Sequence, residues 1–437
     1  MHSNMYERSM PSPSSRIRRF IAWFICLFGG LLGLIGATIM FFVSAAVVPS
    51  AVILLVIALL VCFGVTYAGC RIGLRLARRS HTTQQRFSLR ISVGLSAVFG
   101  ALVTFFIFRP LMLSAAAPTA DATQYWTLSS GSRIAYTYYP ALGSREPTPI
   151  LFLHGGPGLF VLPTDHSFYR QFTRDGFDVY LYDQAGSGRS APLASIEEYT
   201  VRRSVADVEA IRQQIGAEQL ILIGHSWGST LAASYMAAYP THVAKVIFHS
   251  PGALWVREVQ REFHRTAWTG AEEAPPLRIL VALNLLGINP AAAESLISQD
   301  ELGRWFDKQA ATMSTQMVCA GDSQQLPPDM SGSGGNFYAN LAIRGSIDGA
   351  SDAPRPRLAS NTTPALIVHG ACDYIPWDVA YEYKQTLPQA SLVPIDRAGH
   401  MINLTHSELL YTVMRSFLLN EPLPIPAYTQ PEPPVGH

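Results

Sequence analysis

The residues best suited to chemistry are a serine, an aspartate and a histidine in three short motifs. Ser226 stands in the pentapeptide Gly-His-Ser-Trp-Gly at 224–228, and Asp373 and His400 each follow a later apolar run. A serine hydroxyl is a poor nucleophile unless a histidine takes its proton and a carboxylate orients that histidine. The order Ser226, Asp373, His400 therefore predicts a catalytic triad that acts through a covalent acyl intermediate.

The surroundings of Ser226 predict a strand, a sharp turn and a helix. The apolar run at 220–223 comes directly before the pentapeptide, and a small-residue helical pattern at 229–238 follows it. A serine at the tip of such a turn has a strained backbone, and its glycine neighbours leave room for the adjacent strand and helix. We expect this turn to expose the hydroxyl at the end of the strand.

A tetrahedral intermediate needs preorganised hydrogen-bond donors for its oxyanion. We expect one from the backbone N–H of Trp227 and another from the glycine loop at 154–158, with Gly156 the first choice and Gly155 the second. That loop lacks the spacing of dinucleotide- and phosphate-binding loops. The sequence also lacks the usual zinc-binding spacings, so we expect neither a metal nor a cofactor.

Other titratable residues fit these roles less well. Asp183 precedes the serine, which is the wrong chain order, and we expect it to brace the loop at 184–190. Asp378 lies deeper in a predicted helix and should be solvated. His154 opens the glycine loop, where it is better placed to orient the loop than to titrate.

The front of the chain is unusually apolar. The sequence of 437 residues is 49% hydrophobic and only 14% charged, against about 25% charged in an average soluble protein. The apolar excess predicts a membrane region at 1–113 with three transmembrane helices. Their expected bounds are about 20–44, 51–69 and 91–112.

Arginines set the expected orientation of these helices. They cluster before the first span and between the second and third, whereas the turn between the first two spans has none. The positive-inside rule then puts the N-terminus in the cytoplasm and everything after the third span outside, at the plasma (inner) membrane. A net charge of +1 argues against a nucleic-acid partner. The arginines concerned are Arg8, Arg16, Arg18, Arg19, Arg71, Arg75, Arg78, Arg79, Arg86 and Arg90.

Two of the five cysteines, Cys319 and Cys372, fall in the part expected outside the membrane, where disulfides persist. A bridge between them is one possibility. Their spacing alone does not establish that the two backbones approach closely enough.

The rest of the chain alternates short apolar strands with helical segments, which predicts a mostly parallel sheet with helices on both faces. A hairpin is expected at 125–139, and the alternation stops near residue 251 and resumes near 365. We therefore divide the chain into a linker at 114–124, a core at 125–251 and 360–420, a helical cap at 252–359, and a proline-rich tail at 421–437.

These motifs together resemble the α/β-hydrolase superfamily, and within it the proline iminopeptidase group of serine aminopeptidases. The resemblance rests on HGGPG at 154–158, DQAGSGRS at 183–190, the segment at 224–240, and GACD and GH at 370–373 and 399–400. It implies the α/β-hydrolase fold, with Ser226, Asp373 and His400 as the triad and a cap that binds the free N-terminus of a peptide. One departure is Ala185, where the group usually has arginine.

The resemblance implies an aminopeptidase that releases N-terminal residues, proline among them, from short peptides. Cap carboxylates would hold the substrate amine, and the candidates are Glu272, Glu273, Glu294 and Glu301. An esterase or another small-molecule acyl hydrolase is the first alternative, because many activities share this scaffold. A non-catalytic binding module displayed on a membrane anchor is the second. In each case the N-terminal helices make the lipid bilayer a partner.

Overall fold

The computed structural model describes residues 13–112, 123–254, 275–322, 334–348 and 355–434. The chain forms two compact units. The first comprises Met1–Leu111 with Pro275–Ser298, and the second comprises Met112–Ala274 with Gln299–His437. The predicted cap at 252–359 is therefore divided between the two units, and the chain passes from one unit to the other after Leu111, after Ala274 and after Ser298.

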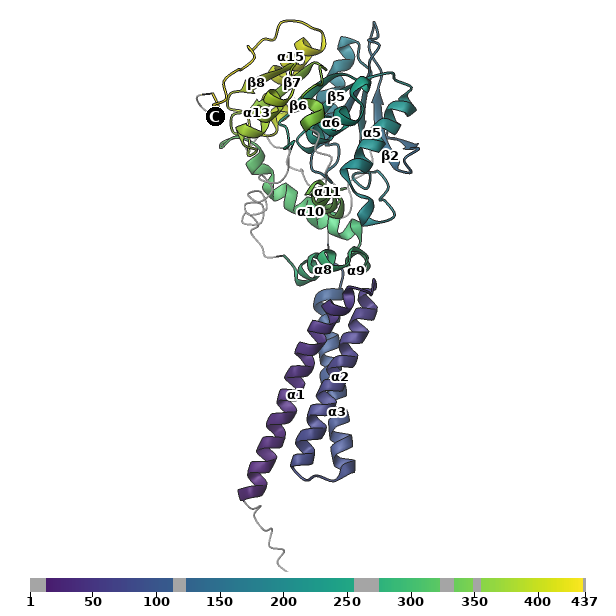
Figure 1. Cartoon of the computed structure of the whole chain (residues 1–437), viewed down its shortest axis with the longest axis vertical. Helices are drawn as coiled ribbons and strands as arrows, with labels where there is room; N and C mark the ends of the chain where they lie inside the picture. The colour runs from purple at the N-terminus through teal and green to yellow at the C-terminus, as the bar shows by residue number, and fades with distance from the viewer. Residues whose placement is uncertain (1–12, 113–122, 255–274, 323–333, 349–354, 435–437) are drawn as a thin grey trace, which may run out of the picture. The chain divides into compact units, whose positions relative to one another are not determined.

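The first unit is built on three long helices, α1 (Pro13–Ala45), α2 (Ala51–Leu76) and α3 (His81–Val103) (Figure 1). A π-helical turn, η1 (Thr104–Phe108), extends the third. All three are long and apolar enough to cross a membrane, as the sequence predicted.

The helices run beyond the predicted spans at several ends. The second continues to Leu76 through Arg71 and Arg75, and the third begins at His81, ten residues before the apolar stretch. Ser80 caps α3 because its hydroxyl accepts the Thr83 N–H. Hydropathy indicates the part of a helix that is suited to lipid, whereas the N-capping residue determines where the helix begins.

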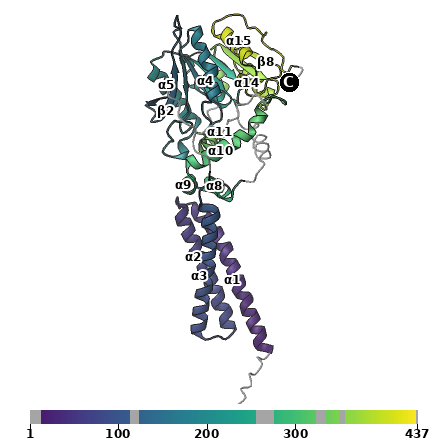
Figure 2. The same cartoon turned by 180° about the vertical axis from the view of Figure 1, so that it is seen from behind.

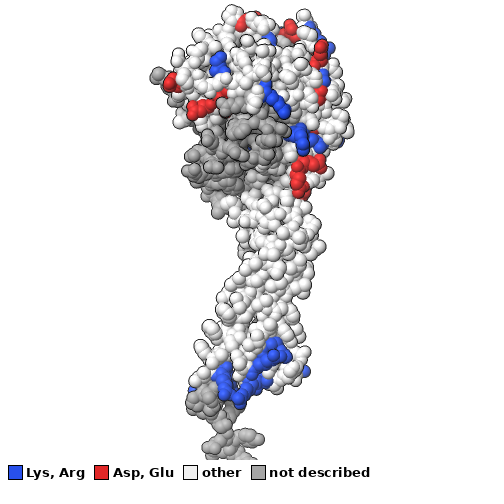
Figure 3. Space-filling model, in the orientation of Figure 1, with Lys and Arg blue, Asp and Glu red and all other residues white. Residues whose placement is uncertain are grey.

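Glycines allow α1 and α2 to pack closely. A Cβ atom added at Gly29 would lie 2.9 Å from the Cα of Gly69. Membrane helices associate through such small residues because their backbones then approach within van der Waals contact. The face of this bundle seen in Figure 3 has no charged atoms along its length, and Lys and Arg gather at the end that carries the α2–α3 turn.

Two further helices belong to this unit although they come late in the sequence. They are α8 (Leu277–Ile288) and α9 (Pro290–Leu296). Both views of the chain show them at the end of the bundle that carries the α1–α2 turn (Figures 1 and 2).

The second unit contains an eight-stranded sheet in the order β1-β2-β4-β3-β5-β6-β7-β8. The predicted hairpin is confirmed as the antiparallel pair β1–β2, β2 pairs antiparallel with β4, and all later pairs are parallel. The strands are β1 (Gln124–Thr127), β2 (Arg133–Tyr139), β3 (Ile150–Leu153), β4 (Val179–Tyr182), β5 (Leu220–His225), β6 (Val243–His249), β7 (Ala365–Gly370) and β8 (Ala390–Ile395).

Helices cover both faces of the sheet and form two apolar layers. One layer packs α5 (Val201–Ile215), α6 (Trp227–Ala238) and α13 (Trp377–Thr386) on one face. The other packs α4 (Pro163–Tyr169), α14 (Ile402–Thr405) and α15 (Ser407–Leu418) on the opposite face. Strands β3, β5 and β7 are buried along their whole length, as expected for a parallel sheet covered on both sides.

Short helices and the cap complete the second unit. The short helices are η2 (Arg170–Asp175), η3 (Ile196–Glu198), η4 (Pro240–His242) and α12 (Arg355–Leu358). In the part of the predicted cap that belongs to this unit, α10 (Gln299–Met313) and η5 (Ser314–Met317) are followed by α11 (Phe337–Asp348). Residues 255–274 of the predicted cap lie outside the described residues.

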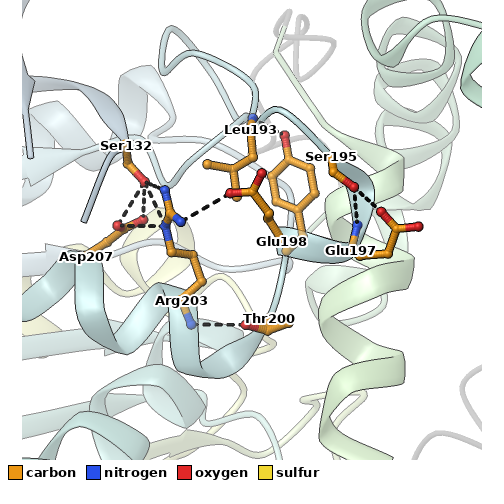
Figure 4. A network of polar contacts seen from close by, with 9 residues as sticks. Ser132, Leu193, Ser195, Glu197, Glu198, Thr200, Arg203 and Asp207 are labelled. Atoms are coloured by element: carbon orange, nitrogen blue, oxygen red, sulfur yellow. Dashed lines mark hydrogen bonds and ion pairs between the residues drawn. The ribbon is translucent and has the colours of Figure 1, made fainter. Parts of the chain in front are cut away.

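A polar cluster fastens α5 to the hairpin turn (Figure 4). The Ser132 hydroxyl donates to Asp207 at 2.9 Å and accepts from the Arg203 guanidinium at 3.1 Å. Arg203 also pairs with Glu198, while Thr200 caps the helix by accepting the Arg203 N–H. Because Asp207 is 3% exposed, these partners offset the cost of burying its charge.

Candidate active site

The turn at Ser226 has the geometry that the sequence predicts. Ser226 lies between β5 and α6 with φ 55° and ψ −122°, a conformation that L-residues rarely adopt. A Cβ atom at Gly224 would collide with the carbonyl oxygen of Gly228, and one at Gly228 would collide with that of Leu153. Gly224 is therefore required by the tight turn from β5 into α6, and Gly228 by the close approach of α6 to the end of β3.

Asp373 and His400 are paired, although 27 residues separate them. Nδ1 of His400 lies 2.9 Å and 3.1 Å from the two carboxylate oxygens of Asp373. The side chain of His400 is 3% exposed, and that of Asp373 is 0% exposed. Burial alone would raise the pKa of Asp373, but His400, His369 and the Ile375 N–H outweigh it and leave that pKa lowered. The carboxylate is thus held ionised against the imidazole.

Tyr374 links this pair to Ser226. Its ring centroid lies 4.5 Å from that of His400, and its hydroxyl interacts with the Ser226 side chain. The three predicted residues thus lie near Tyr374, and their action as a catalytic triad stays a prediction. Sequence reasoning missed Tyr374, although its position directly after the predicted acid is a usable signal.

The glycine loop approaches Ser226 closely. A Cβ atom at Gly155 would lie 3.1 Å from Cβ of Ser226, and Gly156 has a φ of +127°, which favours glycine. Trp227 is the first residue of α6, where backbone N–H groups have no partner within the helix. Gly155 and Trp227 thus lie next to the serine, and the role of these two residues and Gly156 as oxyanion donors stays a prediction.

Side chains brace the glycine loop against its neighbours. His154 accepts the Gln184 N–H at 2.9 Å, and Gln184 in turn donates to the His154 carbonyl and accepts from the Trp227 indole. The carboxylate of Asp183 accepts the N–H groups of Val161 and Arg189, which confirms its predicted bracing role.

Residues at and near the start of α11 hold the other side of the loop. The Asn340 amide donates to the Pro157 carbonyl at 2.7 Å, and the Asn336 N–H donates to the Gly158 carbonyl at 2.7 Å. The Arg344 guanidinium lies 3.5 Å from the Gly156 carbonyl. Burial lowers the pKa of Arg344, and its charge also interacts with Tyr374. Sequence reasoning missed all three residues.

The role of the predicted cap carboxylates stays a prediction. Glu272 and Glu273 lie outside the described residues, and Glu294 belongs to α9 in the first unit. Glu301 is 7% exposed and already engaged in an interaction within the protein.

Two histidines form a buried layer behind the site. The ring of His225 lies 4.7 Å from that of His249 and 4.9 Å from that of His400. Nε2 of His225 is 3.2 Å from the His400 carbonyl. Burial, together with the charge of His400, lowers the pKa of His225 to about 3. A neutral His225 with its proton on Nε2 therefore donates to the backbone of His400.

A pH-dependent stability follows from this burial. Because the folded pKa of His225 is lowered from 6.5 to about 3, the unfolded state binds more protons between these values. As the pH is lowered through this window, we expect the free energy of unfolding of the wild type, relative to His225→Gln, to fall by up to about 1.4 kcal/mol for each pH unit. Urea unfolding of both proteins across that range measures the difference. A difference independent of pH would contradict the buried, neutral imidazole.

A disulfide joins the cap to the loop that carries Asp373. Cys319 and Cys372 are bonded, with their Cα atoms 5.3 Å apart, so the bridge considered from the sequence is present. The Met401 N–H also donates to the Met317 carbonyl at 3.0 Å. The end of η5 and the segment after it are thus linked to the loop that carries Asp373 and to Met401, the residue that follows His400.

Removing this bridge should destabilise the second unit. The cysteines are 53 residues apart, and for a loop of this size we expect Cys319→Ser/Cys372→Ser to lose about 2–4 kcal/mol of unfolding free energy. Denaturant unfolding of the oxidised wild type and the double variant measures the loss. Because Cys26, Cys62 and Cys70 are free and buried, a reductant should affect the wild type but not the double variant. Equal stability of the two proteins would contradict a structural role for the bridge.

The fold and the elbow define the class of protein. Residues 148–407 match the α/β-hydrolase fold family, and the chain belongs to that family. An esterase from Exiguobacterium antarcticum shares the fold, with a TM-score of 0.51 at 16% sequence identity, over 68% of this chain and 98% of that one.

Among curated relatives the chain is similar to proline iminopeptidases. It is 37% identical over 116 residues to the enzyme of Neisseria meningitidis, covering 26% of this chain and 36% of that protein. The match thus spans about a third of that relative's length. A probable proline iminopeptidase from Leptolyngbya boryana is 27% identical over 295 residues, covering 60% of this chain and 84% of that protein.

Proposed function

We propose that the protein is a serine hydrolase in which Ser226 attacks a substrate carbonyl and His400 takes the proton of its hydroxyl. The observation that carries the proposal is the buried Asp373–His400 pair beside a strained serine. Asp373 keeps Nδ1 of the imidazole protonated, so that Nε2 serves as the base. The N–H groups of Trp227 and of Gly156 or Gly155 stabilise the oxyanion.

Collapse of the tetrahedral intermediate forms an acyl-enzyme. His400 gives its proton to the leaving group, the bond between the carbonyl carbon and that group breaks, and the ester to Ser226 remains. Water then loses a proton to His400 and attacks the ester. The acid is released, and the proton returns to the Ser226 oxygen.

The substrate we propose is a short peptide or aminoacyl amide with a free N-terminal residue, in particular proline. Support comes from the similarity to proline iminopeptidases and from the HGGPG and GHSWGS segments, which resemble that group. The test is turnover of prolyl, alanyl and leucyl amides, each with a free and a blocked N-terminus, alongside simple esters. Preference for the free prolyl amide supports the proposal, and turnover of esters alone contradicts it.

A small-molecule esterase is the second candidate, and Arg344 favours it. This half-buried cation lies 3.5 Å from the Gly156 carbonyl, and a positive charge there disfavours a substrate ammonium group. If Arg344 repels the amine, Arg344→Gln should raise kcat/KM for free aminoacyl amides and leave the blocked amides unchanged. A variant that leaves the ratio of free to blocked turnover unaltered would remove this argument.

We further propose that α1, α2 and α3 anchor the enzyme in the plasma (inner) membrane, with the catalytic unit outside the cytoplasm. The arginines near the α2–α3 turn support this orientation, and the Cys319–Cys372 bridge suits an oxidising compartment. External protease added to intact spheroplasts should degrade the catalytic unit, with a cytoplasmic protein as the control. Protection of that unit until the cells are lysed would contradict the orientation.

A further inference from the structure

The segment at 275–298 interrupts the hydrolase sequence between β6 and β7, yet it packs with the membrane helices rather than with the sheet. Its two helices lie at the end of the bundle formed by the α1–α2 turn and η1 (Figures 1 and 2). In the sequence it precedes the cap helix α10 directly.

Hydrogen bonds fix this segment to the ends of two long helices. The Asn289 amide donates to the Ala45 carbonyl at the last residue of α1, at 2.9 Å. The Ser295 hydroxyl oxygen accepts the N–H of Ala51, the first residue of α2, at 2.8 Å. The ends of helices leave such groups without partners inside the helix. The segment therefore caps the bundle at a defined depth along its helices.

The one charged residue of α8 is turned into the protein. Arg278 is 5% exposed, and its guanidinium donates to the carbonyls of Ile107 at 2.6 Å and Leu296 at 2.7 Å. Ile107 lies in η1, at the end of the third long helix. The contact fixes α8 to that helix and leaves the outer surface of α8 without charge.

That outer surface is mostly apolar. Leu277, Leu280 and Ile288 are 50%, 42% and 43% exposed, and their helical spacing places them with Asn284 on one side of α8. At the same end of the bundle, Phe105 and Phe106 are 57% and 56% exposed. Exposed leucine and isoleucine side chains are costly in water but suit the boundary between headgroups and acyl chains, where the Arg109 guanidinium over the Phe105 ring can reach the headgroups.

We propose that α8 lies in the membrane interface, with Leu277, Leu280 and Ile288 in contact with lipid acyl chains. The occupant is lipid of the leaflet at this end of the bundle, because the surface adjoins the helices we propose to span that bilayer. The inference rests on the proposed anchoring but is independent of the hydrolase activity and of the orientation. Lipid contact would restrain residues 275–298, which directly precede the cap helix α10 in the sequence.

The test places a nitroxide label at position 280 of the full-length chain. Leu280→Cys is made in a background where Cys26, Cys62 and Cys70 are alanine, and the protein is reconstituted in phosphatidylcholine–phosphatidylglycerol vesicles. Matched labels at Leu60→Cys, in the middle of α2, and at Leu142→Cys, on the catalytic unit, replace leucines that are 65% and 58% exposed. Power saturation compares collision with oxygen, which enters lipid, and with a water-soluble nickel chelate.

We expect the oxygen-to-nickel ratio at position 280 to be several-fold higher than at 142 and lower than at 60. Ile288→Cys should give the same result and guards against a local defect in the first variant. A ratio at 280 equal to that at 142, or protection from both reagents, would overturn lipid contact, and the latter would indicate a protein neighbour such as a second copy. If the label at 60 also collides with nickel, the anchoring itself is wrong.

Discussion

Ser226→Ala is expected to lower kcat by about 10⁶-fold, because it removes the atom that forms the acyl-enzyme. What remains is catalysis by the oxyanion donors and by substrate binding. The fold should be retained, because alanine is smaller than serine and the φ of 55° is equally unfavourable for both. Steady-state kinetics on the best amide or ester substrate measures the loss, and circular dichroism verifies folding.

A neighbouring serine provides the control. Ser234 lies in α6, the helix that follows Ser226, and its hydroxyl donates to the Thr230 carbonyl within that helix at 2.8 Å. Ser234→Ala should keep kcat within about threefold of the wild type, because substitutions outside the catalytic site usually have small effects. Near-normal turnover by a folded Ser226→Ala variant would refute the assignment of the nucleophile.

Asp373→Asn is expected to lower kcat by about 10⁴-fold while preserving the shape of the site. An amide in place of the carboxylate donates to Nδ1 of His400 and forces the proton onto Nε2, which can then no longer act as the base. The substitution also removes the charge that stabilises the imidazolium during the reaction. The measurement is kcat on the substrate used for Ser226→Ala.

Asp378 is the matched control for the acid. It lies five residues further on, exposed in the first turn of α13, so Asp378→Asn should leave kcat near the wild-type value. Comparable losses for the two variants would mean that the Asp373–His400 contact is not the one that matters. A loss below tenfold for Asp373→Asn would point to a different acid.

The predicted catalytic residues follow local rules, and this explains why their motifs are visible in the sequence. The elbow needs glycine at 224 because β5 turns sharply into α6, and at 228 because α6 approaches β3 so closely; this requirement is visible as a pentapeptide between a strand and a helix. Asp373 and His400 come directly after buried strands of a parallel sheet, whose carboxyl ends share one edge. Chain order alone therefore brings them together.

Features that depend on long-range packing could not be predicted from local sequence patterns. Asn336 and Asn340 contact the glycine loop from about 180 residues away, and nothing in their local pattern marks them. The segment at 275–298 has the helical periodicity expected of a cap, and its contacts with Ala45, Ala51 and Ile107 assign it to the membrane helices. A disulfide likewise requires two backbones to meet, which spacing does not reveal.

The central claim is that the Ser226 hydroxyl is activated by the buried Asp373–His400 pair. Its most direct test is reaction of the purified, folded protein with a fluorophosphonate probe, followed by peptide mapping of the modified residue. The account predicts one label on Ser226, no label in Ser226→Ala, and much slower labelling in Asp373→Asn. A folded wild-type protein that stays unlabelled, or that carries the label on another residue, would contradict it.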